Sequence, residues 1–410
     1  MKRLPLSLLV TFTILAFIQV ATSRDLRQVT EPKTPQTCTS LRGDGKLVTE
    51  EIQKALNSCA KGKAVALSSG NFVSGPLTIP SGVSLLIDKG VTLTASNDAA
   101  LYNTETKICG TLNERYDGCK NFITMTGNTG SGIYGQGTID GQGDKKIAGK
   151  DITWWQLTSQ AKAAKKNQNN PTLIRINNGV DITLHQITLK NSPYFHVISY
   201  GTNGFTVWGI TIDTPSNTAN TDGIDPGGSQ NVTIANCNIN TGDDNIAITA
   251  FNSPSRYISI LNNHLGHGSS MGIGSGTSHG VSDVTVSGMT LINSRFGLYI
   301  KSNTQTGGLV SNIVYENICI TNSPKPITLD VYRSTSGSLT PQFTNIVLNN
   351  VRAVTRGTVV VRGISSSHPG QVTIKDVHVA KGSKIQVTNA KVTGTWAEDA
   401  SGTCGYAGNK

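Results

Sequence analysis

The chain has 410 residues, 44 of them glycine, with only 15% charged residues and a formal net charge of +10. That length allows one to three ordinary domains, and the glycine-rich, weakly charged composition favours one long non-helical unit. No Lys/Arg run is longer than a few residues and no nucleic-acid-binding module is recognisable, so nucleic acid is a poor candidate partner. The positive charge instead suits an acidic polysaccharide, or else reflects a basic isoelectric point without a particular partner.

The N-terminus has the pattern of a secretory signal peptide. Two basic residues precede an apolar stretch over residues 4–20, and the small residues 21–23 form a cleavage site. We therefore expect a signal peptide over residues 1–23 and a secreted, extracellular mature chain over residues 24–410. An uncleaved anchor is the alternative. Because the stretch is short for a span and no second apolar segment follows, we expect no membrane association.

Export to an oxidising compartment makes disulfides reasonable for the seven cysteines. The economical local pairs, each closing a short loop, are Cys38–Cys59 and Cys109–Cys119. The other three cannot all pair with one another; they are Cys237, Cys319 and Cys404. We therefore expect at least one free thiol, buried in a strand.

Two segments differ from the β-rich remainder of the chain. Residues 47–59 predict a helix with Thr49 as its N-cap and with one apolar face. Its expected task is to cover the N-terminal end of the core. Residues 153–170 predict a protruding loop or a short helix, in which the pair Trp154–Trp155 is expected to pack under the loop rather than form a sugar platform.

Short β-branched segments recur through the second half of the chain. Their first apolar residues lie 23 to 33 residues apart, with Asn- or Gly-containing turns between them. Repeats of this length and composition are typical of parallel β-helix coils, whereas a propeller blade needs roughly 40–50 residues. We therefore predict an all-β chain built as a single parallel β-helix (a solenoid) with a short N-terminal capping helix. The segments are 181–184, 205–207, 231–234, 257–260, 284–286, 312–314, 345–347 and 372–374.

Two acidic clusters, in residues 220–225 and 241–245, lie about one coil apart. Neighbouring coils stack at about 4.8 Å, so Asp222, Asp243 and Asp244 are expected to crowd one surface patch. Crowding raises the pKa of at least one carboxyl, as an acid catalyst needs, while another stays ionised to activate water. Paired carboxylates of this kind are the usual machinery for hydrolysing a glycosidic bond. The alternative is that these side chains merely decorate turns.

The motifs Asn220–Asp225 and Thr241–Asp244 resemble the signature of the polygalacturonases of glycoside hydrolase family 28, with bacterial secreted members the most similar. The similarity extends from about residue 29 to about residue 380. Further segments that match the family are 74–77, 80–93, 132–135, 137–143, 154–155 and 191–193.

This resemblance implies a right-handed parallel β-helix and hydrolysis, with inversion, of α-1,4-galacturonosyl linkages in pectin or polygalacturonate. By motif position, Asp243 is the general acid, and Asp222 and Asp244 hold and deprotonate the attacking water. Asn220 is a substrate contact. Inversion ordinarily needs carboxyl groups roughly 6.5–9.5 Å apart. Since carboxylates supply both proton steps, no metal or other cofactor is expected, and we expect a monomer.

One departure from the family pattern concerns a histidine. Counting back from Met271 places the family's histidine position at Ser269, with His267 two residues earlier. A two-residue shift keeps a side chain on the same face of an extended strand but moves it by about 6.6 Å. Either His267 substitutes after local rearrangement, or the histidine function is lost and Ser269 faces the substrate.

A second departure replaces the family's Arg-Ile-Lys by Tyr299, Ile300 and Lys301. Lys301 can still pair with a substrate carboxylate, but Tyr299 can only stack on a sugar or hydrogen-bond through its hydroxyl. Loss of a charge-assisted contact costs on the order of 1.5–3 kcal/mol. Tyr332, in the loop after Pro326, is a further candidate substrate contact.

These departures leave two alternatives to a fully active hydrolase. One is a catalytically impaired relative that binds pectin or its fragments without cleaving them, and the other is a hydrolase retuned to a less charged pectin. A pectate lyase shares the β-helix but needs a calcium site and a basic catalyst, which the acidic triad argues against. A structural wall-associated protein is the weakest alternative.

Overall fold

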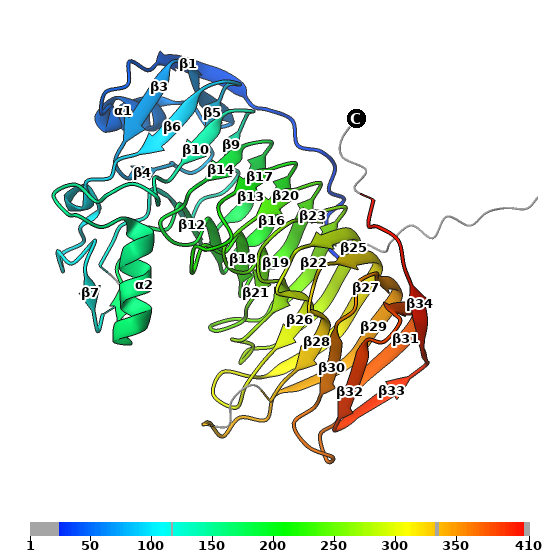
Figure 1. Cartoon of the computed structure of the whole chain (residues 1–410). Coiled ribbons are helices and arrows are strands. Elements are labelled where there is room, and N and C mark those ends of the chain that lie inside the picture. Colours follow the sequence, from blue (N-terminus) through cyan, green and yellow to red (C-terminus); the bar gives the residue numbers. More distant parts are fainter. Residues whose placement is uncertain (1–23, 116–117, 333–335, 406–410) are drawn as a thin grey trace, which may run out of the picture.

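The computed structural model describes residues 24–115, 118–332 and 336–405, in which the chain winds into a parallel β-helix (Figure 1). Coils stack strand on strand into one sheet of 21 strands and one of 11. The crossovers are right-handed, the hand that connections between parallel strands almost always take. The predicted fold class is therefore confirmed.

All eight segments predicted from the repeat lie in strands of the 21-stranded sheet. These strands are β13 (Val180–His185), β16 (Asn203–Trp208), β19 (Gln230–Ala235), β22 (Ser255–Leu261), β25 (Val281–Ile292), β27 (Leu309–Thr321), β29 (Gln342–Ala353) and β31 (Gly370–Ala380). The first apolar residues of consecutive segments also pair in register, which confirms the repeat. They are Ile182, Phe205, Val232, Ile258, Val284, Ile313, Ile346 and Val372.

The remaining strands of this sheet extend the same ladder or form a second side of the coils. They are β1 (Gln36–Arg42), β2 (Lys63–Ser69), β3 (Asn71–Ser74), β5 (Ser84–Ile87), β6 (Thr92–Ala95), β9 (Gly132–Tyr134), β10 (Thr138–Asp140), β14 (Thr188–Lys190), β17 (Thr211–Asp213), β20 (Asn238–Asn240), β23 (His264–Leu265), β33 (Ala390–Thr393) and β34 (Trp396–Ala400). Of these, β1, β2, β5, β9 and β33 extend the ladder at its two ends, and the others form the second side of the coils.

The 11-stranded sheet forms a separate face of the β-helix. Its strands are β4 (Leu77–Thr78), β8 (Ile123–Thr126), β12 (Ile174–Asn177), β15 (Val197–Tyr200), β18 (Ile224–Gly227), β21 (Ile246–Ile248), β24 (Met271–Ile273), β26 (Phe296–Lys301), β28 (Lys325–Asp330), β30 (Thr358–Arg362) and β32 (Lys384–Thr388).

The core is a set of apolar ladders that run along the axis of the β-helix. Side chains alternate between the two faces of a strand, so one residue in two points inward. Ile224, Ile246, Met271 and Leu298 occupy such inward positions on consecutive strands, and all four are fully buried. The residues between them face outward and are available for function.

Asparagines occupy several corners of the coils. Asn312 and Asn345 have φ of 57° and 50°, a left-handed conformation that asparagine tolerates better than most residues. The Nδ2 of Asn345 donates to the Oδ1 of Asn312 at 2.8 Å. Such amide bonds connect equivalent corners of neighbouring coils and account for the Asn-rich turns of the sequence.

The predicted capping helix is α1 (Thr49–Ser58), which buries Ile52 and Leu56 completely against the first coils (Figure 1). The prediction of Thr49 as N-cap is wrong. The N-cap is Val48, without a side-chain cap bond, because the Thr49 hydroxyl instead accepts from the amide of Gly75 at 2.7 Å.

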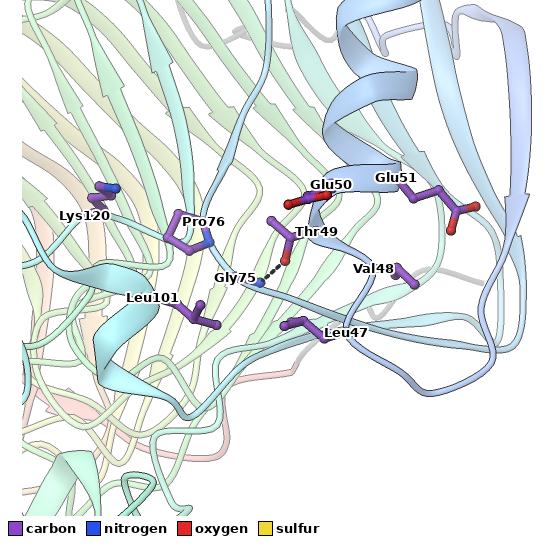
Figure 2. A pocket seen from close by; sticks show the side chains of 9 residues that line it. All are labelled: Leu47, Val48, Thr49, Glu50, Glu51, Gly75, Pro76, Leu101 and Lys120. Atoms are coloured by element: carbon purple, nitrogen blue, oxygen red, sulfur yellow. Dashed lines mark hydrogen bonds between the residues drawn. The ribbon is translucent and has the colours of Figure 1, made fainter.

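Figure 2 shows this contact in a hollow at the N-terminal end of the β-helix. The residues that line it come from α1, from the segment around Gly75 and from the short 3-10 helix η1 (Ala99–Tyr102), and none of the predicted catalytic residues is among them.

The second departure from β structure is helix α2 (Trp154–Ala164), which confirms the short-helix alternative. Thr153 and Gln156 form a capping box at its start. Trp154 is only 1% exposed, and the indole of Trp155 donates to a backbone carbonyl at 2.9 Å. Packing rather than a sugar platform therefore explains Trp154. Beside α2, β7 (Leu112–Asn113) and β11 (Asn167–Gln168) pair in antiparallel fashion.

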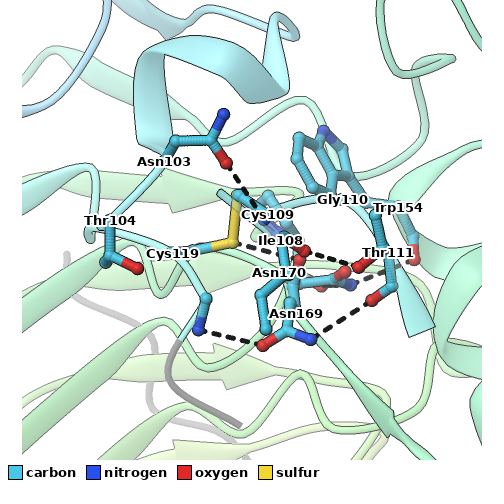
Figure 3. The surroundings of a disulfide bond; sticks show 12 residues. Asn103, Thr104, Ile108, Cys109, Gly110, Thr111, Cys119, Trp154, Asn169 and Asn170 are labelled. Carbon is cyan, nitrogen blue, oxygen red and sulfur yellow. Dashed lines mark hydrogen bonds between the residues drawn. A yellow bond between two sulfur atoms is a disulfide. The ribbon is translucent and has the colours of Figure 1, made fainter. Parts of the chain in front are cut away.

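The Cys109–Cys119 disulfide holds the loop next to this region (Figure 3). Asn169 is the centre of the surrounding hydrogen bonds, because its Oδ1 accepts from the Gly118 amide at 3.0 Å and its Nδ2 donates to the Thr111 carbonyl at 3.3 Å. The loop is therefore fixed both covalently and by one buried amide side chain.

The other cysteines confirm the second local pair and the buried free thiol. Cys38–Cys59 ties the end of α1 to β1, and Cys319–Cys404 ties β27 to the C-terminal segment. Cys237 is the free thiol of the described part of the chain; it is buried, and burial raises its pKa to about 12. Its predicted place in a strand is wrong, because Cys237 lies in the turn between β19 and β20.

Two predictions concern membranes and targeting. No helix within the described ranges is long and apolar enough to cross a membrane. The predicted signal peptide, residues 1–23, lies outside the described residues.

Candidate active site

The two acidic motifs form turns that lead into consecutive strands of the 11-stranded sheet. Asp222 lies two residues before β18, and Asp244 lies two residues before β21. The amide of Gly223 donates to the Asp244 carbonyl at 2.9 Å, so the two turns stack directly on each other. The turns that carry Asp222 and Asp244 therefore lie on adjacent coils of the β-helix.

Asp222, Asp243 and Asp244 converge as the spacing predicts. One carboxylate oxygen of each residue lies within 4.8 Å of the corresponding oxygens of the other two. Asp222 and Asp244 are buried, with exposed fractions of 8% and 2%, whereas the side chain of Asp243 is 25% exposed. Asp243 is thus the member of the cluster that is most open to an arriving ligand.

Lys301 and Ser270 hold Asp244 in place. The Lys301 ammonium donates to Oδ2 of Asp244, and the Ser270 hydroxyl donates to Oδ1 at 2.7 Å. Burial lowers the pKa of Lys301, but attraction to Asp244 and the other carboxylates outweighs that effect and raises the pKa overall. Lys301 is therefore a permanent positive charge within the acidic cluster.

Asp222 and Asp225 are held in surroundings that favour their protonated forms. Burial raises the pKa of Asp222 well above its usual range, and the charges of Asp225, Asp243 and Asp244 raise it further. Burial and the charge of Asp244 likewise raise the pKa of Asp225. Lys301 opposes both shifts without cancelling them. Asp222 and Asp225 therefore hold their protons above the ordinary pH range of a carboxyl group.

Comparisons with known proteins place this cluster in a family. The family model "Glycosyl hydrolases family 28" matches residues 59–400. The chain therefore belongs to glycosyl hydrolase family 28. This confirms the resemblance and identifies the chain as a glycoside hydrolase.

Individual relatives agree with that assignment. The chain is 47% identical, over 382 residues, to an endo-polygalacturonase of Pectobacterium carotovorum subsp. carotovorum. That alignment covers 92% of this chain and 95% of the relative. It is 40% identical to a polygalacturonase of Ralstonia solanacearum, over 73% of this chain and 65% of the relative. The solved polygalacturonase from Erwinia carotovora ssp. carotovora superposes with a TM-score of 0.89 at 46% identity, covering 90% of this chain and 100% of that one.

His196 holds the backbone of Asp222 through a hydrogen bond. Its Nδ1 lies 2.9 Å from the Asp222 carbonyl, which can only accept, so Nδ1 carries the proton and Nε2 accepts from the Thr214 hydroxyl at 2.8 Å. Burial lowers the pKa of His196 to about 4, which keeps the ring neutral. A neutral, fully hydrogen-bonded imidazole fixes the backbone that carries Asp222.

Two further groups approach Asp243. The amide of Asn220 donates to its Oδ2 at 3.4 Å, from a residue with φ of 56°. The guanidinium of Arg295 lies 3.5 Å from its Oδ1 and donates to the Gly242 carbonyl at 3.1 Å. Asn220 is thus part of the site, as expected, and it contacts Asp243 through its backbone amide.

The histidine departure has a structural consequence. The Nε2 of His267 donates to the Thr214 carbonyl at 2.9 Å, and within the described ranges no hydrogen bond joins His267 to the three carboxylates. Ser269 is 7% exposed, and its amide donates to the Asp243 carbonyl at 2.8 Å. Ser269 therefore lies one coil beyond the catalytic turn, directly against it, while the His267 ring is engaged elsewhere. A catalytic role for His267 stays a prediction.

Tyr299 and Lys301 lie on the outward face of β26. The Tyr299 ring stacks on Phe296 with centroids 4.3 Å apart and an interplanar angle of 12°. The Lys301 Nζ lies 5.6 Å from the Tyr299 centroid. Tyr299 is thus a largely buried ring, 8% exposed, that packs between Phe296 and Lys301 at the position where the family has arginine.

Tyr332 lies farther along the β-helix, after β28. It is 41% exposed, and its ring centroid lies 5.7 Å from the guanidinium of Arg362. Arg362 in turn donates from Nε to Asp330 at 2.9 Å. Tyr332 therefore packs on this ion pair, one coil beyond Lys301, and its role as a substrate contact remains a prediction.

The three carboxylates are also close enough to share a cation. The Lys301 ammonium, however, already donates to Oδ2 of Asp244 and the Ser270 hydroxyl to Oδ1, so both oxygens of this carboxylate are engaged. The donor set is therefore better matched to proton transfer than to a resident metal, and the expectation of no metal stays a prediction.

Sequence reasoning did not single out four residues of this site: Asp225, Ser270, His196 and Arg295. Asp225 belongs to the quoted motif, and strand alternation places it outward beside Asp222, so the pattern contained its signal. His196 and Arg295 belong to no motif. They reach the cluster only because neighbouring coils stack in this register, which no local pattern reveals.

Proposed function

We propose that this family 28 protein hydrolyses α-1,4 linkages between galacturonic acid residues in polygalacturonate or pectin. The convergence of Asp222, Asp243 and Asp244 with Lys301 among them carries the proposal. Carboxylates provide the proton steps of glycoside hydrolysis, and the cation suits an anionic sugar. The names of the most similar relatives, endo-polygalacturonases, support the same substrate.

In the proposed mechanism Asp243 is the general acid. It is the most open of the three carboxyl groups, so it can reach the oxygen of a linkage bound along the sheet. Burial and mutual repulsion retain one proton in the carboxylate cluster. Asp243 takes this proton from Asp222, whose carboxyl oxygen lies within 4.8 Å of its own, and delivers it to the leaving oxygen as the bond to the anomeric carbon breaks. Asp222 is thereby left ionised to act on water.

Asp222 and Asp244 act together on the attacking water. Ser270 and Lys301 hold Asp244, and His196 fixes the backbone of Asp222, so both groups are positioned before substrate arrives. The water adds to the anomeric carbon while its proton passes to this pair. The cluster thus loses one proton to the leaving group and gains one from water, and its charge is unchanged after each turnover.

One oxygen of each carboxylate lies within 4.8 Å of the others, and this limit applies to Asp243 as well as to Asp222 and Asp244. The separation of roughly 6.5–9.5 Å that is usual for inverting enzymes refers to whole carboxyl groups, which lie farther apart than their closest oxygens. In the proposal Asp222 and Asp244 flank one water jointly, and Asp243 faces the leaving oxygen. Inversion therefore remains part of the proposal.

We also propose that the protein is secreted, acts outside the cell as a monomer, and loses residues 1–23. The signal-peptide pattern supports export. The three disulfides suit an oxidising compartment. Mass spectrometry of the secreted chain, with Arg24 or a neighbour as its first residue, tests the cleavage.

Reducing-sugar release from polygalacturonate and from methyl-esterified pectin tests the function, with Asp243→Asn as the matched variant. We expect release by the wild type and a loss of roughly 10²- to 10⁴-fold in the variant, the usual contribution of a general acid. Binding without release from either polymer would instead support the impaired relative suggested by Ser269 and Tyr299. An unsaturated, ultraviolet-absorbing product would indicate a lyase.

A further inference from the structure

Arg295 reaches from the turn before β26 to the proposed catalytic acid. Its amide donates to the Gly268 carbonyl at 3.1 Å, one coil back. Its guanidinium donates to the Gly242 carbonyl at 3.1 Å and lies 3.5 Å from Oδ1 of Asp243. The Arg295 side chain is nevertheless 57% exposed. A solvent-facing cation thus stands at the mouth of the carboxylate cluster.

Arg295 and Lys301 differ in how far their charges are already used. Lys301 is 14% exposed and bound to Asp244, whose side chain is 2% exposed, so its charge is largely balanced inside the protein. Arg295 instead contacts a partly open carboxylate at a longer distance. Exposed ion pairs of this kind are weak, and a guanidinium has five N–H donors to offer. Arg295 can therefore turn toward an incoming anion at a smaller loss of ion-pair energy than Lys301 can.

The surface beside Arg295 carries further positive charge. Phe296 and Tyr299 stack on each other, and the Nζ of the exposed Lys325 lies 5.1 Å from the Phe296 centroid. Tyr299 is only 8% exposed, so the aromatic pair packs beside the site and holds an ammonium group there. An anionic sugar therefore finds the Arg295 guanidinium with the Lys325 ammonium nearby.

We propose that Arg295 binds the carboxylate of the galacturonate residue at the scissile bond and releases Asp243 as it does so. This inference rests on the proposed function. A free carboxylate accepts two parallel N–H bonds from a guanidinium, so it displaces Asp243 from a longer and more exposed contact. A methyl ester carries no charge and leaves Arg295 on Asp243. The free carboxylate of the sugar is thus bound by Arg295, and its binding removes the guanidinium from Asp243.

The proposal also accounts for the departure at Tyr299. The family's arginine is absent from that position, but a guanidinium four residues earlier in the chain reaches the same catalytic turn. Arg295 therefore supplies from a turn the bidentate contact that Tyr299 cannot make from the strand.

The test compares Arg295→Gln and Arg295→Lys with Arg256→Gln as a control. Arg256 lies on β22 in the other sheet and donates to Gln230, away from the site. KM and kcat are measured separately on polygalacturonate and on highly methyl-esterified pectin. For Arg295→Gln we expect kcat/KM to fall roughly 10- to 100-fold on polygalacturonate but less than about threefold on the esterified polymer. Lysine should give an intermediate loss, and the control should match the wild type.

Equal losses on both polymers, or no loss on polygalacturonate, would overturn the role of Arg295. Direct calorimetric titration with a galacturonate trimer separates this outcome from failure of the proposed function. If the wild type releases no sugar, the proposed function fails, yet the inference still requires that Arg295→Gln bind the trimer more weakly than the wild type. Equal affinities would contradict it whether or not the protein is an active hydrolase.

Discussion

The ammonium of Lys301 contacts the buried carboxylate of Asp244, although the two residues are 57 positions apart in the chain. The ion pair joins the turn before β21 to the end of β26, across two coils of the β-helix. Because both partners are largely buried, each depends on the other for compensation of its charge. The pair is therefore structural as well as functional.

Removing the cation should leave Asp244 as an uncompensated buried charge. We expect Lys301→Met, which keeps much of the side-chain volume, to lower the free energy of unfolding by about 3–5 kcal/mol. The double variant Lys301→Met/Asp244→Asn should recover most of this stability while remaining inactive. Urea denaturation of the wild type, both single variants and the double variant measures the coupling. A double variant no more stable than Lys301→Met would contradict the assignment.

The buried carboxyls Asp222 and Asp225 should make the protein less stable as pH rises. Burial, then the neighbouring carboxylates, raises both pKa values above the ordinary 3.8. A carboxyl with a raised pKa in the folded state contributes stability that is complete below its unfolded pKa. That contribution is lost as pH rises through the folded pKa, because the folded state then holds an unfavourable charge.

Asp225→Asn isolates this effect. The variant should have a higher Tm than the wild type at about pH 8, and the difference should shrink as pH falls toward about 4. Asp213→Asn is a suitable control, because the Asp213 carboxylate is 54% exposed beside Lys190. Thermal unfolding across this pH range measures the difference. A gain that is constant with pH would show that Asp225 does not hold a proton in the native state.

The fold was predictable because each coil repeats the same physical requirement. The inward apolar side chain of Ile182 is covered by those of Phe205 and Val232 on the next two coils, so the repeat determines both strands and register. The convergence of Asp222 and Asp244 followed from the same regularity. Local disulfides such as Cys38–Cys59 were equally accessible.

Contacts between distant or irregular segments were not predictable. Cys319 and Cys404 are 85 residues apart, so no short loop signals their bond. The Thr49 hydroxyl left its expected capping role because Gly75, from a later coil, offers an amide donor. Arg295 reaches Gly242 only through the conformation of a turn and the length of its side chain. Such contacts depend on three-dimensional placement, which a repeat pattern does not contain.

Inversion gives a stereochemical prediction. Hydrolysis of an α-linkage with inversion releases a β-configured reducing end as the first product. Proton NMR of a galacturonate oligomer during the first turnovers should therefore show the β-anomer before mutarotation. An α-anomer formed first would indicate a covalent intermediate on Asp222 or Asp244.

Restoring the family's arginine should matter only when Arg295 is missing. If Arg295 already supplies the charged contact, Tyr299→Arg in the wild type adds a second guanidinium to a satisfied carboxylate. It also removes the ring that stacks on Phe296. We expect less than about a threefold gain in kcat/KM on polygalacturonate in that background, but about tenfold or more in an Arg295→Gln background. Substitutions of residues that bind the same partner have non-additive effects. The difference between the two gains therefore measures how far both arginines bind the same substrate carboxylate. A tenfold gain in both backgrounds would mean that the wild type lacks the contact, and Arg295 would lose its assigned role.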